Sequence, residues 1–464
     1  MRSDAQQFTS LSLSNFRGFK NAPDIPLAPL TFLVGPNSSG KSSIFDALLL
    51  IAQSLTHTIG DFFVPNWIGP LVDLGSYTDA VFGHNELLPI TIAFGIRVDP
   101  NYPYSERRGR LVTVHIEFQF RAKKHDPVGR IARIRVIDHD SELSLAVRFG
   151  PTEESKAEMT FLGRVFSYDP RFSKRPRWYG LSDWIAEKVG AATKSSSPRL
   201  AKSKISVFRR LVRIVTSLSV LGFIFQTQRV SSGRSAPKRW YPRTAVMTEP
   251  RRWIHTPRIF DSVDPGALED RKTSDEFGFH RRPRIRIEAT LASVLKQLDI
   301  AKSIEAKELS AYHSVITVRD NRLDVESKLI DVGFGASQVI PVILGCLSEN
   351  AGPLLVEQPE IHLHPKAQGY IAELLCKTSL HRQVIVETHS EHMINRARIM
   401  IAKGKLHHKD VLINYVIRDH KGSRVTTIPL SPEGEFAEAW PEGFFDERFQ
   451  DTLTLLNIKQ QKGE

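Results

Sequence analysis

The residues with the clearest chemical potential form the segment GPNSSGKSS, which fits the pattern G-x-x-x-x-G-K-[ST]. Its glycines let the backbone turn so that N–H groups point at phosphate oxygens. Lys41 would place a positive charge on the β/γ-phosphates, and Ser42 would place its hydroxyl on Mg²⁺. The spacing therefore predicts a nucleotide site formed by Gly35, Pro36, Asn37, Ser38, Ser39, Gly40, Lys41, Ser42 and Ser43.

The alternative is an accidental glycine-rich turn, and the flanking residues argue against it. A short apolar strand at residues 30–34 precedes the loop, and a helix to about Ser54 follows it, with a positive dipole end beside the phosphates. The apolar residues of this helix recur at helical spacing: Ile44, Ala47, Leu48 and Ile51.

Further candidate residues lie in the C-terminal third. The strand LLVE ends in Glu357, an acid that could hold Mg²⁺ through water at the edge where ligands of α/β sheets collect. The stretch IDVGFGASQ places glycines and Ser337 just before a helix, which suits phosphate. The strand VIVE leads into Thr388-His389-Ser390, where a histidine could meet a γ-phosphate, and His364-Pro365 opens another helix.

Each of these elements has a simpler explanation as a strand-end acid, a glycine turn or a helix cap. Their order after the phosphate loop favours a split nucleotide site. A dedicated transition-metal site is disfavoured, because the histidines lack cysteine partners and an obvious carboxylate triad. The histidines in question are His362, His364, His389 and His392.

Bulk composition is that of a globular protein: 464 residues with 41% hydrophobic and 25% charged side chains. Two cysteines, Cys346 and Cys376, favour buried reduced thiols in a cytoplasmic protein. The N-terminus lacks the apolar core of a secretory signal. The longest apolar stretch outside the loop helix, residues 211–225, is too short and polar to span a bilayer, so no membrane partner is expected.

Strand–helix alternation predicts an α/β fold, with the phosphate-loop strand completed by the C-terminal third and the middle inserted. Five period-two runs after residue 87 predict an antiparallel sheet, and a helix is expected over 288–309. The expected parts are an N-terminal ATPase lobe (1–86), an antiparallel β subdomain (87–168), a basic helical and loop insert (169–304), a C-terminal ATPase lobe (305–430) and a tail (431–464).

The insert carries much of the net charge of +12: residues 201–260 hold thirteen Lys/Arg and one acid. Helical pieces are expected at 182–191 and 205–221, followed by a basic loop. Such a surface could bind polyanions, or it could cradle an acidic protein or simply face solvent. The candidate nucleic-acid or partner contacts are Arg234, Lys238, Arg239 and Arg243.

The motif series NFRGF, GPNSSGKSS, DVGFGASQ, LLVEQPEIHLHP and VIVETHSE resembles that of ABC-type ATPases of the AAA15, or OLD-like, class. This class is related to the recombination protein RecF and to the heads of SMC proteins. The ending WPEGFFDE at residues 440–447 is similar to one short subgroup.

The resemblance implies an ABC-type P-loop ATPase head with inserted β and basic segments, in which two heads sandwich ATP and Mg²⁺. It implies that Glu357 stands at the Walker B position, that His389 is the switch histidine, and that Ser42 and Glu357 serve the metal. The signature facing the partner's nucleotide would be Gly335, Ala336, Ser337 and Gln338.

Two departures from the family pattern matter. Gln358 occupies the place of the usual general base, and an amide cannot accept a proton from water at neutral pH. Slow hydrolysis is therefore expected, with Gln358 orienting water and Glu360 as a reserve carboxylate. Asp419-His420 is also no D-x-D pair, so a Toprim nuclease domain is not expected here.

The leading interpretation is a homodimer or higher oligomer that closes on ATP and controls an effector, a nuclease or toxin encoded nearby, in anti-phage defence. An alternative is a RecF-like DNA clamp or loader in which the basic insert grips duplex DNA. A third is a scaffold whose ATP is structural.

Overall fold

The computed structural model describes most of the N-terminal and C-terminal parts of the chain and isolated parts of the middle. The described residues are 6–56, 64–98, 112–123, 126–138, 143–149, 157–161, 164–168, 224, 227–234, 239, 241–242, 258–259, 287–310, 313–348, 352–438 and 454.

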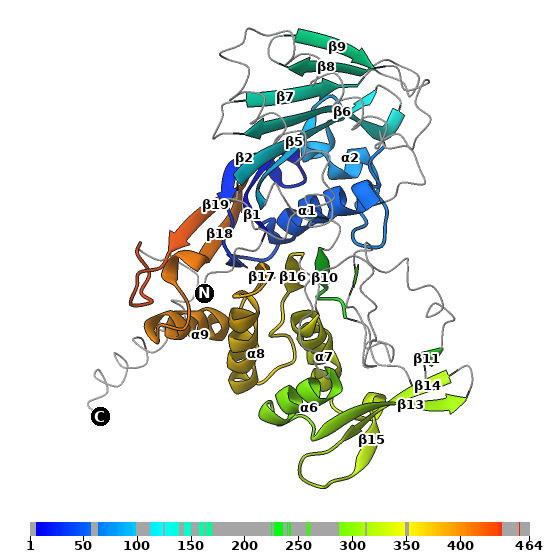
Figure 1. The fold of residues 1–464 in the computed structure, drawn as a ribbon, viewed down its shortest axis with the longest axis vertical. Helices are drawn as coiled ribbons and strands as arrows, with labels where there is room; N and C mark the ends of the chain where they lie inside the picture. The colour runs from blue at the N-terminus through cyan, green and yellow to red at the C-terminus, as the bar shows by residue number, and fades with distance from the viewer. Residues whose placement is uncertain are drawn as a thin grey trace, which may run out of the picture.

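A seven-stranded sheet carries the phosphate loop at its centre (Figure 1). Its strands are parallel except for the last, which pairs antiparallel with its neighbour. In spatial order they are β12 (Arg258–Ile259), β10 (Gln228–Val230), β16 (Leu354–Glu357), β17 (Val384–Glu387), β3 (Leu30–Val34), β18 (Val411–Asp419) and β19 (Gly422–Pro429).

The central strands β16, β17 and β3 are apolar and buried along their whole length, because helices cover both faces of the sheet. They bring together segments that lie more than 300 residues apart in the chain: β3 pairs with β17 through Leu33 and Glu387. The acid-bearing β16 lies one strand further from the loop.

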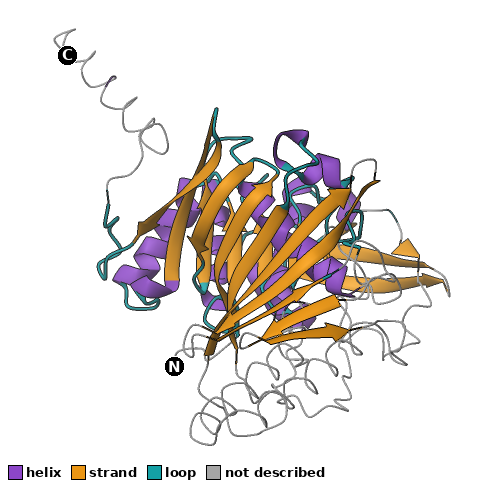
Figure 2. Ribbon diagram, turned by 90° about the horizontal axis from the view of Figure 1, so that it is seen from above, coloured by secondary structure: helices purple, strands orange, loops and turns teal. Residues whose placement is uncertain are grey.

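An eight-stranded antiparallel sheet forms a second layer. In Figure 2 it is seen from its outer face, with helices behind it. Its strands in spatial order are β2 (Phe19–Pro26), β1 (Gln7–Phe16), β4 (Ile90–Val98), β5 (Val112–Lys123), β6 (Asp126–Asp138), β7 (Leu143–Arg148), β8 (Ala157–Phe161) and β9 (Arg164–Tyr168).

Helices fill the space between the sheets and cover the free face of the parallel one. α1 lies between the two sheets, whereas α7, α8 and α9 cover the opposite face of the parallel sheet (Figure 1). The described helices are α1 (Lys41–Thr56), α2 (Tyr77–Ala80), α6 (Ile287–Gln297), α7 (Phe334–Leu347), α8 (Pro365–Thr378) and α9 (Glu391–Ala402), with short 3-10 turns at Phe82–His84, Leu329–Asp331 and His408–Asp410.

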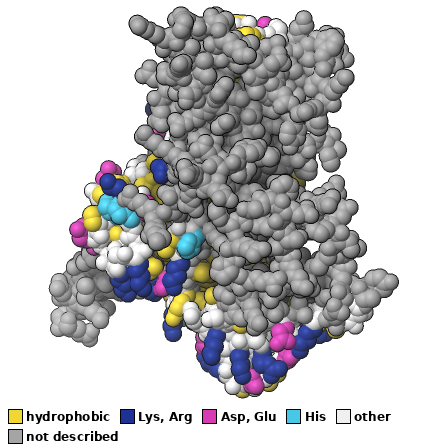
Figure 3. Space-filling model, viewed as in Figure 1, with side chains coloured by type: hydrophobic (Ala, Val, Ile, Leu, Met, Phe, Trp, Pro, Cys, Tyr) yellow, Lys and Arg dark blue, Asp and Glu magenta, His cyan; other side chains and the backbone are white. Residues whose placement is uncertain are grey.

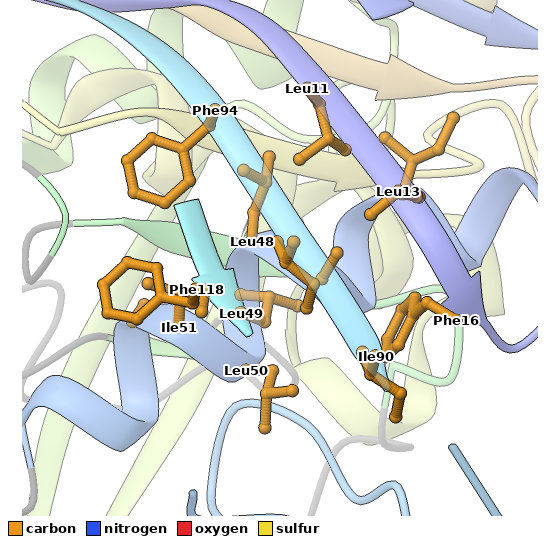
Figure 4. Packing of buried hydrophobic residues seen from close by; sticks show 14 of the residues in the cluster. Leu11, Leu13, Phe16, Leu48, Leu49, Leu50, Ile51, Ile90, Phe94 and Phe118 are labelled. Atoms are coloured by element: carbon orange, nitrogen blue, oxygen red, sulfur yellow. The ribbon is translucent and has the colours of Figure 1, made fainter. Parts of the chain in front are cut away.

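Two hydrophobic clusters match these layers. The first joins α1 to the antiparallel sheet, and Figure 4 shows Leu48 and Leu49 of α1 near Leu11, Leu13 and Phe94 of the strands. Burying one such side chain contributes about 1.5–3 kcal/mol. The start of α1, which carries the phosphate loop, is therefore fixed by packing on both sides.

The ABC-type α/β fold class with an inserted antiparallel sheet is confirmed, whereas the residue limits of the five parts stay predictions. The sheet expected over 87–168 forms as β4 to β9, and the hairpin β1–β2 extends it. The helix to about Ser54 is also confirmed. The helices expected at 182–191 and 205–221 and the WPEGFFDE ending lie outside the described residues.

The helix expected over 288–309 is wrong in its second half. α6 ends at Gln297, and residues Ser303–Ser310 form β13 instead. β13 pairs with β14 (His313–Arg319), which brings Ile304 opposite Val318. This third sheet also includes β11 (Tyr241–Pro242) and β15 (Glu326–Lys328). Tertiary pairing overrides local helix preference here, since Ile304 and Ile316 gain burial in the sheet.

One buried side chain joins the two layers near the loop strand. Gln383, immediately before β17, is 2% exposed. Its amide group donates to the carbonyl oxygens of Phe8 (2.8 Å) and Ala28 (3.0 Å), and its carbonyl oxygen accepts from the Phe8 N–H at 2.8 Å. The start of β1 is therefore joined to the parallel sheet through this one side chain.

We predict that Gln383→Ala lowers the free energy of unfolding by about 2–4 kcal/mol, because two or three buried backbone groups lose their partner. Chemical denaturation followed by circular dichroism measures this loss. Gln7→Ala, at a partly exposed position of β1, is the matched control. A loss no larger than in the control would show that Gln383 does not join the layers.

Candidate functional site

The phosphate loop is built around a buried lysine. Lys41 is 4% exposed, and its ammonium group donates to the loop carbonyls of Gly35 (3.1 Å) and Pro36 (2.8 Å). Burial lowers the Lys41 pKa, while the nearby carboxylates of Glu387 and Glu360 act in the opposite direction. The structure thus places a desolvated cation inside the loop, where a phosphate could replace the carbonyl contacts.

The loop glycines meet real steric constraints. Gly35 has φ +138° and lies so close to the Val416 carbonyl that a Cβ would overlap it. Gly40 has φ +110°, and a Cβ there would lie 2.7 Å from the hydroxyl oxygen of Ser423. The loop tip between them, from Pro36 to Ser38, is exposed and accessible to a ligand.

Two acids end neighbouring strands on the same edge of the sheet. Glu357 of β16 and Glu387 of β17 are register partners. Side chains along a strand alternate between its two faces, so Glu357 shares a face with Leu355 and Glu387 shares a face with Ile385. Leu355 and Ile385 belong to the hydrophobic cluster that contains α1. Both carboxylates therefore face the N-terminus of α1, and Glu387 is one strand closer to the loop.

The hydroxyl of Ser42 donates to Glu387 rather than to the predicted Walker B residue. The distances from Ser42 Oγ to Glu387 Oε2 and Oε1 are 2.9 Å and 3.2 Å. Burial raises the Glu387 pKa to about 7, with the charges of Glu357 and Asp46 adding to the increase and Ser42 and Lys41 opposing it.

Glu357 is held by β10 and the residues that follow it, which belong to the predicted insert. Its Oε1 accepts from Arg229 Nε at 2.8 Å, and its Oε2 accepts from the backbone N–H (3.0 Å) and the hydroxyl (3.1 Å) of Ser232. Arg229 also donates to the Leu71 carbonyl at 2.6 Å. The predicted metal acid is thus part of a network that connects β16 to residues 227–234.

Arg234, predicted as a nucleic-acid or partner contact, is buried rather than displayed on the surface. Its side chain is 5% exposed and donates to the carbonyls of Glu357 (3.1 Å) and Gln358 (3.1 Å). A buried guanidinium that satisfies this turn cannot also contact a phosphate backbone. Gln358, in turn, has φ +42° and donates its N–H to the Glu387 carbonyl at 2.7 Å. A positive φ at a non-glycine residue stores strain, which is typical of functional turns.

The remaining predicted catalytic residues lie together. Glu360 Oε1 accepts from the His389 backbone N–H at 2.7 Å, and burial raises the Glu360 pKa. Burial, together with the Lys41 charge, lowers the His389 pKa, so the imidazole is neutral at pH 7. Among the described residues, His389 Nε2 is buried without a hydrogen-bond partner. It could therefore contact a bound phosphate.

A fourth acid near the loop is Asp46 of α1, whose charge also raises the Glu387 pKa. It pairs with Arg17 at 3.0 Å. Burial raises the Asp46 pKa to about 6, and the charges of Arg17 and Arg229 partly offset the increase. The acids of α1, β16 and β17 thus influence one another, and a divalent cation would relieve their mutual repulsion.

The predicted signature residues occupy the first turn of α7. Ser337 is 3% exposed and Gln338 2% exposed, and Gln338 donates to the Arg234 carbonyl at 3.4 Å. A Cβ on Gly335 would lie 2.8 Å from the His362 carbonyl. Gly333, which precedes the helix, is exposed. Of the segment around the predicted signature, the turn before α7 is thus exposed, whereas the serine itself is buried.

Of the other predicted partner contacts, only Arg239 is described. Its guanidinium is 65% exposed and lies 3.5 Å from the Asp331 carboxylate. Lys238 and Arg243 lie outside the described residues. On the face in Figure 3, basic and acidic side chains gather together at the lower end, over β13–β15. They form ion pairs with each other, as in Lys302–Asp324 and Arg322–Asp299.

The residues present fit Mg²⁺ with a nucleotide. The described residues contain no group of three or more His, Cys, Asp or Glu suited to a metal. Mg²⁺ in nucleotide sites takes only one or two protein oxygens, together with phosphates and water. The hydroxyl of Ser42 beside the Glu387 carboxylate is such a set.

Sequence reasoning missed Glu387, Arg229, Ser232 and Asp46. Glu387 ends an apolar strand just as Glu357 does, and this was the available signal. The other three depend on contacts between distant segments. The two cysteines are free; Cys376 is buried, as predicted, whereas Cys346 is only partly buried. No helix in the described part of the chain has the length and apolar character needed to span a membrane.

Family models match three parts of the chain. Residues 8–126 match "AAA ATPase domain", and residues 166–395 match "AAA domain, putative AbiEii toxin, Type IV TA system". Residues 406–455 match a domain described as a protein of unknown function. The two AAA matches together include the phosphate loop, the acid-bearing strands and the histidine turn.

Among curated proteins, the chain is similar to an OLD nuclease of Thermus scotoductus, with 28% identity over 434 residues. The alignment covers 89% of this chain and 65% of the relative, so the chain spans about two thirds of that protein's length.

Among solved structures, the chain is similar to an SMC head domain from Thermotoga maritima, with 14% identity and a TM-score of 0.38. The match covers 92% of this chain and 99% of that one. The Smc head domain of Pyrococcus furiosus, bound to the C-terminal domain of ScpA, has 13% identity and a TM-score of 0.41, and the match covers 91% and 96%.

We predict that Lys41→Ala weakens nucleotide binding by roughly 10- to 150-fold, because a charged hydrogen-bond donor contributes about 1.5–3 kcal/mol. Titration of a fluorescent ATP analogue measures the affinity. Lys403→Ala, at the exposed end of α9, is the control. Unchanged affinity in the Lys41 variant would overturn the assignment of the loop.

A second prediction concerns pH. The folded protein retains a proton on Glu387 to about pH 7, whereas an unfolded glutamate loses it near pH 4.3. The free energy of unfolding should therefore fall as pH rises through this window. Thermal melts without nucleotide, from about pH 5 to about pH 8, should show a weaker decline for Glu387→Gln. The same decline in both proteins would contradict the assigned pKa.

Proposed function

Because the chain is an ABC-type ATPase of the AAA15/OLD-like class, we propose that it is an ATP-dependent switch that controls an effector protein. Two copies would close on ATP and Mg²⁺, hydrolyse slowly, and hold or release a nuclease or toxin. Anti-phage defence is the proposed setting, by analogy with the OLD nuclease and the toxin family that the chain resembles.

One observation carries the proposal: β10 and the residues after it bind the end of β16 and the turn at Glu357 and Gln358. Arg229 and Ser232 hold the Glu357 carboxylate, and Arg234 holds the two carbonyls that follow it. A ligand that shifts this turn would move the insert strand as well. The site thus has a direct mechanical connection to the segment that lies between the two lobes.

The chain's own residues supply most of the proposed chemistry. Lys41 would exchange its loop carbonyls for phosphate oxygens, and the neutral His389 would contact the terminal phosphate. Mg²⁺, when bound, would neutralise phosphate charge. Gln358 would orient the attacking water without accepting its proton, while Glu360, whose Oε1 accepts from the His389 backbone N–H, could accept it.

The RecF-like alternative requires a continuous basic surface. Among the described residues, the burial of Arg234 and the internal ion pairs of β13–β15 remove part of that surface. Effector control is therefore our preferred interpretation. If purified protein bound duplex DNA with strong salt dependence, the alternative would take its place.

The proposed closure can be tested at Gly333, where a Cβ would contact nothing within 4 Å. An arginine there should leave ATP binding intact but block the approach of a second copy. Sedimentation velocity with ATP and Mg²⁺ should show a dimer for the natural protein and a monomer for Gly333→Arg. The control is Leu323→Arg, because Leu323 is 78% exposed and lies away from the N-terminus of α7 in the chain.

Arginine at Ser337 would be a poorer test, because that side chain is buried and the substitution would disrupt α7. If Gly333→Arg dimerises normally with ATP, the N-terminus of α7 does not face a second copy.

Replacing Gln358 by glutamate should raise turnover, since a general base contributes about 10²–10⁴ in rate. Steady-state phosphate release measures the change. Gln119→Glu in the antiparallel sheet should have no effect. Unchanged or lower turnover in Gln358→Glu would show that the missing base does not limit hydrolysis.

A further inference from the structure

We propose that Glu387, at the end of β17, is the carboxylate that positions Mg²⁺ through Ser42, and that Glu357 has a separate role in holding the insert strand. The proposal rests on the nucleotide-binding function above. It concerns which of two neighbouring strands supplies the acid beside the phosphate loop.

Strand order is the first argument. β17 pairs with both β16 and β3, so it lies between the predicted Walker B strand and the loop strand. Neighbouring strands are about 4.8 Å apart. Glu387 and Glu357 share one register and one face, hence Glu387 is nearer to Ser42 by about one strand spacing.

Hydrogen bonding is the second argument. Ser42 Oγ donates to Glu387 Oε2 at 2.9 Å. Glu357, by contrast, accepts from Arg229 at 2.8 Å and from Ser232 at 3.0 and 3.1 Å. Both oxygens of Glu357 therefore already have strong protein donors. Three of the roughly four acceptor sites of the Glu357 carboxylate are thus already occupied by protein donors, whereas Glu387 accepts from Ser42 alone among the described residues.

Charge compensation is the third argument. Glu387 is 5% exposed, and among the described residues its carboxylate accepts hydrogen bonds only from Ser42. Lys41, although close, directs its ammonium at Gly35 and Pro36. A buried carboxylate is costly without a cation and further hydrogen bonds. A hydrated Mg²⁺ on the exposed Ser42 would provide both.

Glu387 is thus a positioning residue: it orients the serine hydroxyl and accepts from metal-bound water. Outer partners of this kind typically contribute about 10–100-fold to metal affinity. The nucleotide itself would keep its contacts to the loop backbone and Lys41.

The test is the affinity of Mn²⁺ for the ADP complex, measured by electron paramagnetic resonance of the free ion. In Glu387→Gln this affinity should fall by about 10–100-fold, while the affinity for ADP without metal stays unchanged or rises. Glu391→Gln, in the first turn of α9, is the matched control. A Glu387→Gln variant with natural Mn²⁺ affinity would overturn the proposal.

Two further variants test which of the two acids serves the metal and whether Glu387 acts through Ser42. Glu357→Gln should reduce Mn²⁺ affinity far less than Glu387→Gln, and the reverse order would overturn the proposal. Ser42→Ala combined with Glu387→Gln should lose less Mn²⁺ affinity than the two single losses added together, because part of the effect of Glu387 acts through the Ser42 hydroxyl. Additive losses would contradict this.

Glu387→Asp keeps the charge and shortens the reach, so it provides the same comparison should the glutamine variant fold poorly. An intermediate Mn²⁺ affinity is expected, and natural affinity would count against the proposal. If the natural protein does not bind ADP at all, the proposed nucleotide function fails, and this inference fails with it.

Discussion

The parallel pairing of β17 with β3 is the constraint on which the site depends. It places the end of a strand near residue 387 beside a loop near residue 35. The phosphate loop, the His389 turn and both strand-end acids then share one edge of a single sheet. Because these strands are buried on both faces, helix packing on either side holds the edge in place.

The same edge connects to the middle of the chain. β10 pairs with β16 and continues directly into the residues that hold Glu357 and the following turn. Arg234 is buried and Arg229 is partly buried, and both donate to residues at the end of β16. Part of the positive charge of the insert therefore stabilises the fold and is not displayed on the surface. A charge count alone could not distinguish clamping arginines from surface ones.

Much of the site could be predicted from local sequence. The phosphate loop, its helix and the strand ending in Glu357 depend on short-range pattern, and these three elements formed as expected. The contact between Ser42 and Glu387 could not be predicted, since it requires the order of strands in the sheet. The end of α6 was misplaced because β13 is stabilised by pairing with β14 rather than by local preference.

The central claim is that distant segments form one nucleotide site coupled to the insert strand. Hydrogen–deuterium exchange with and without a non-hydrolysable ATP analogue and Mg²⁺ tests it most directly. The account predicts that the ligand protects residues 35–43, 357–360 and 387–390 together, and that exchange of residues 227–234 also changes. Protection confined to the phosphate loop, with no change in the other segments, would contradict it.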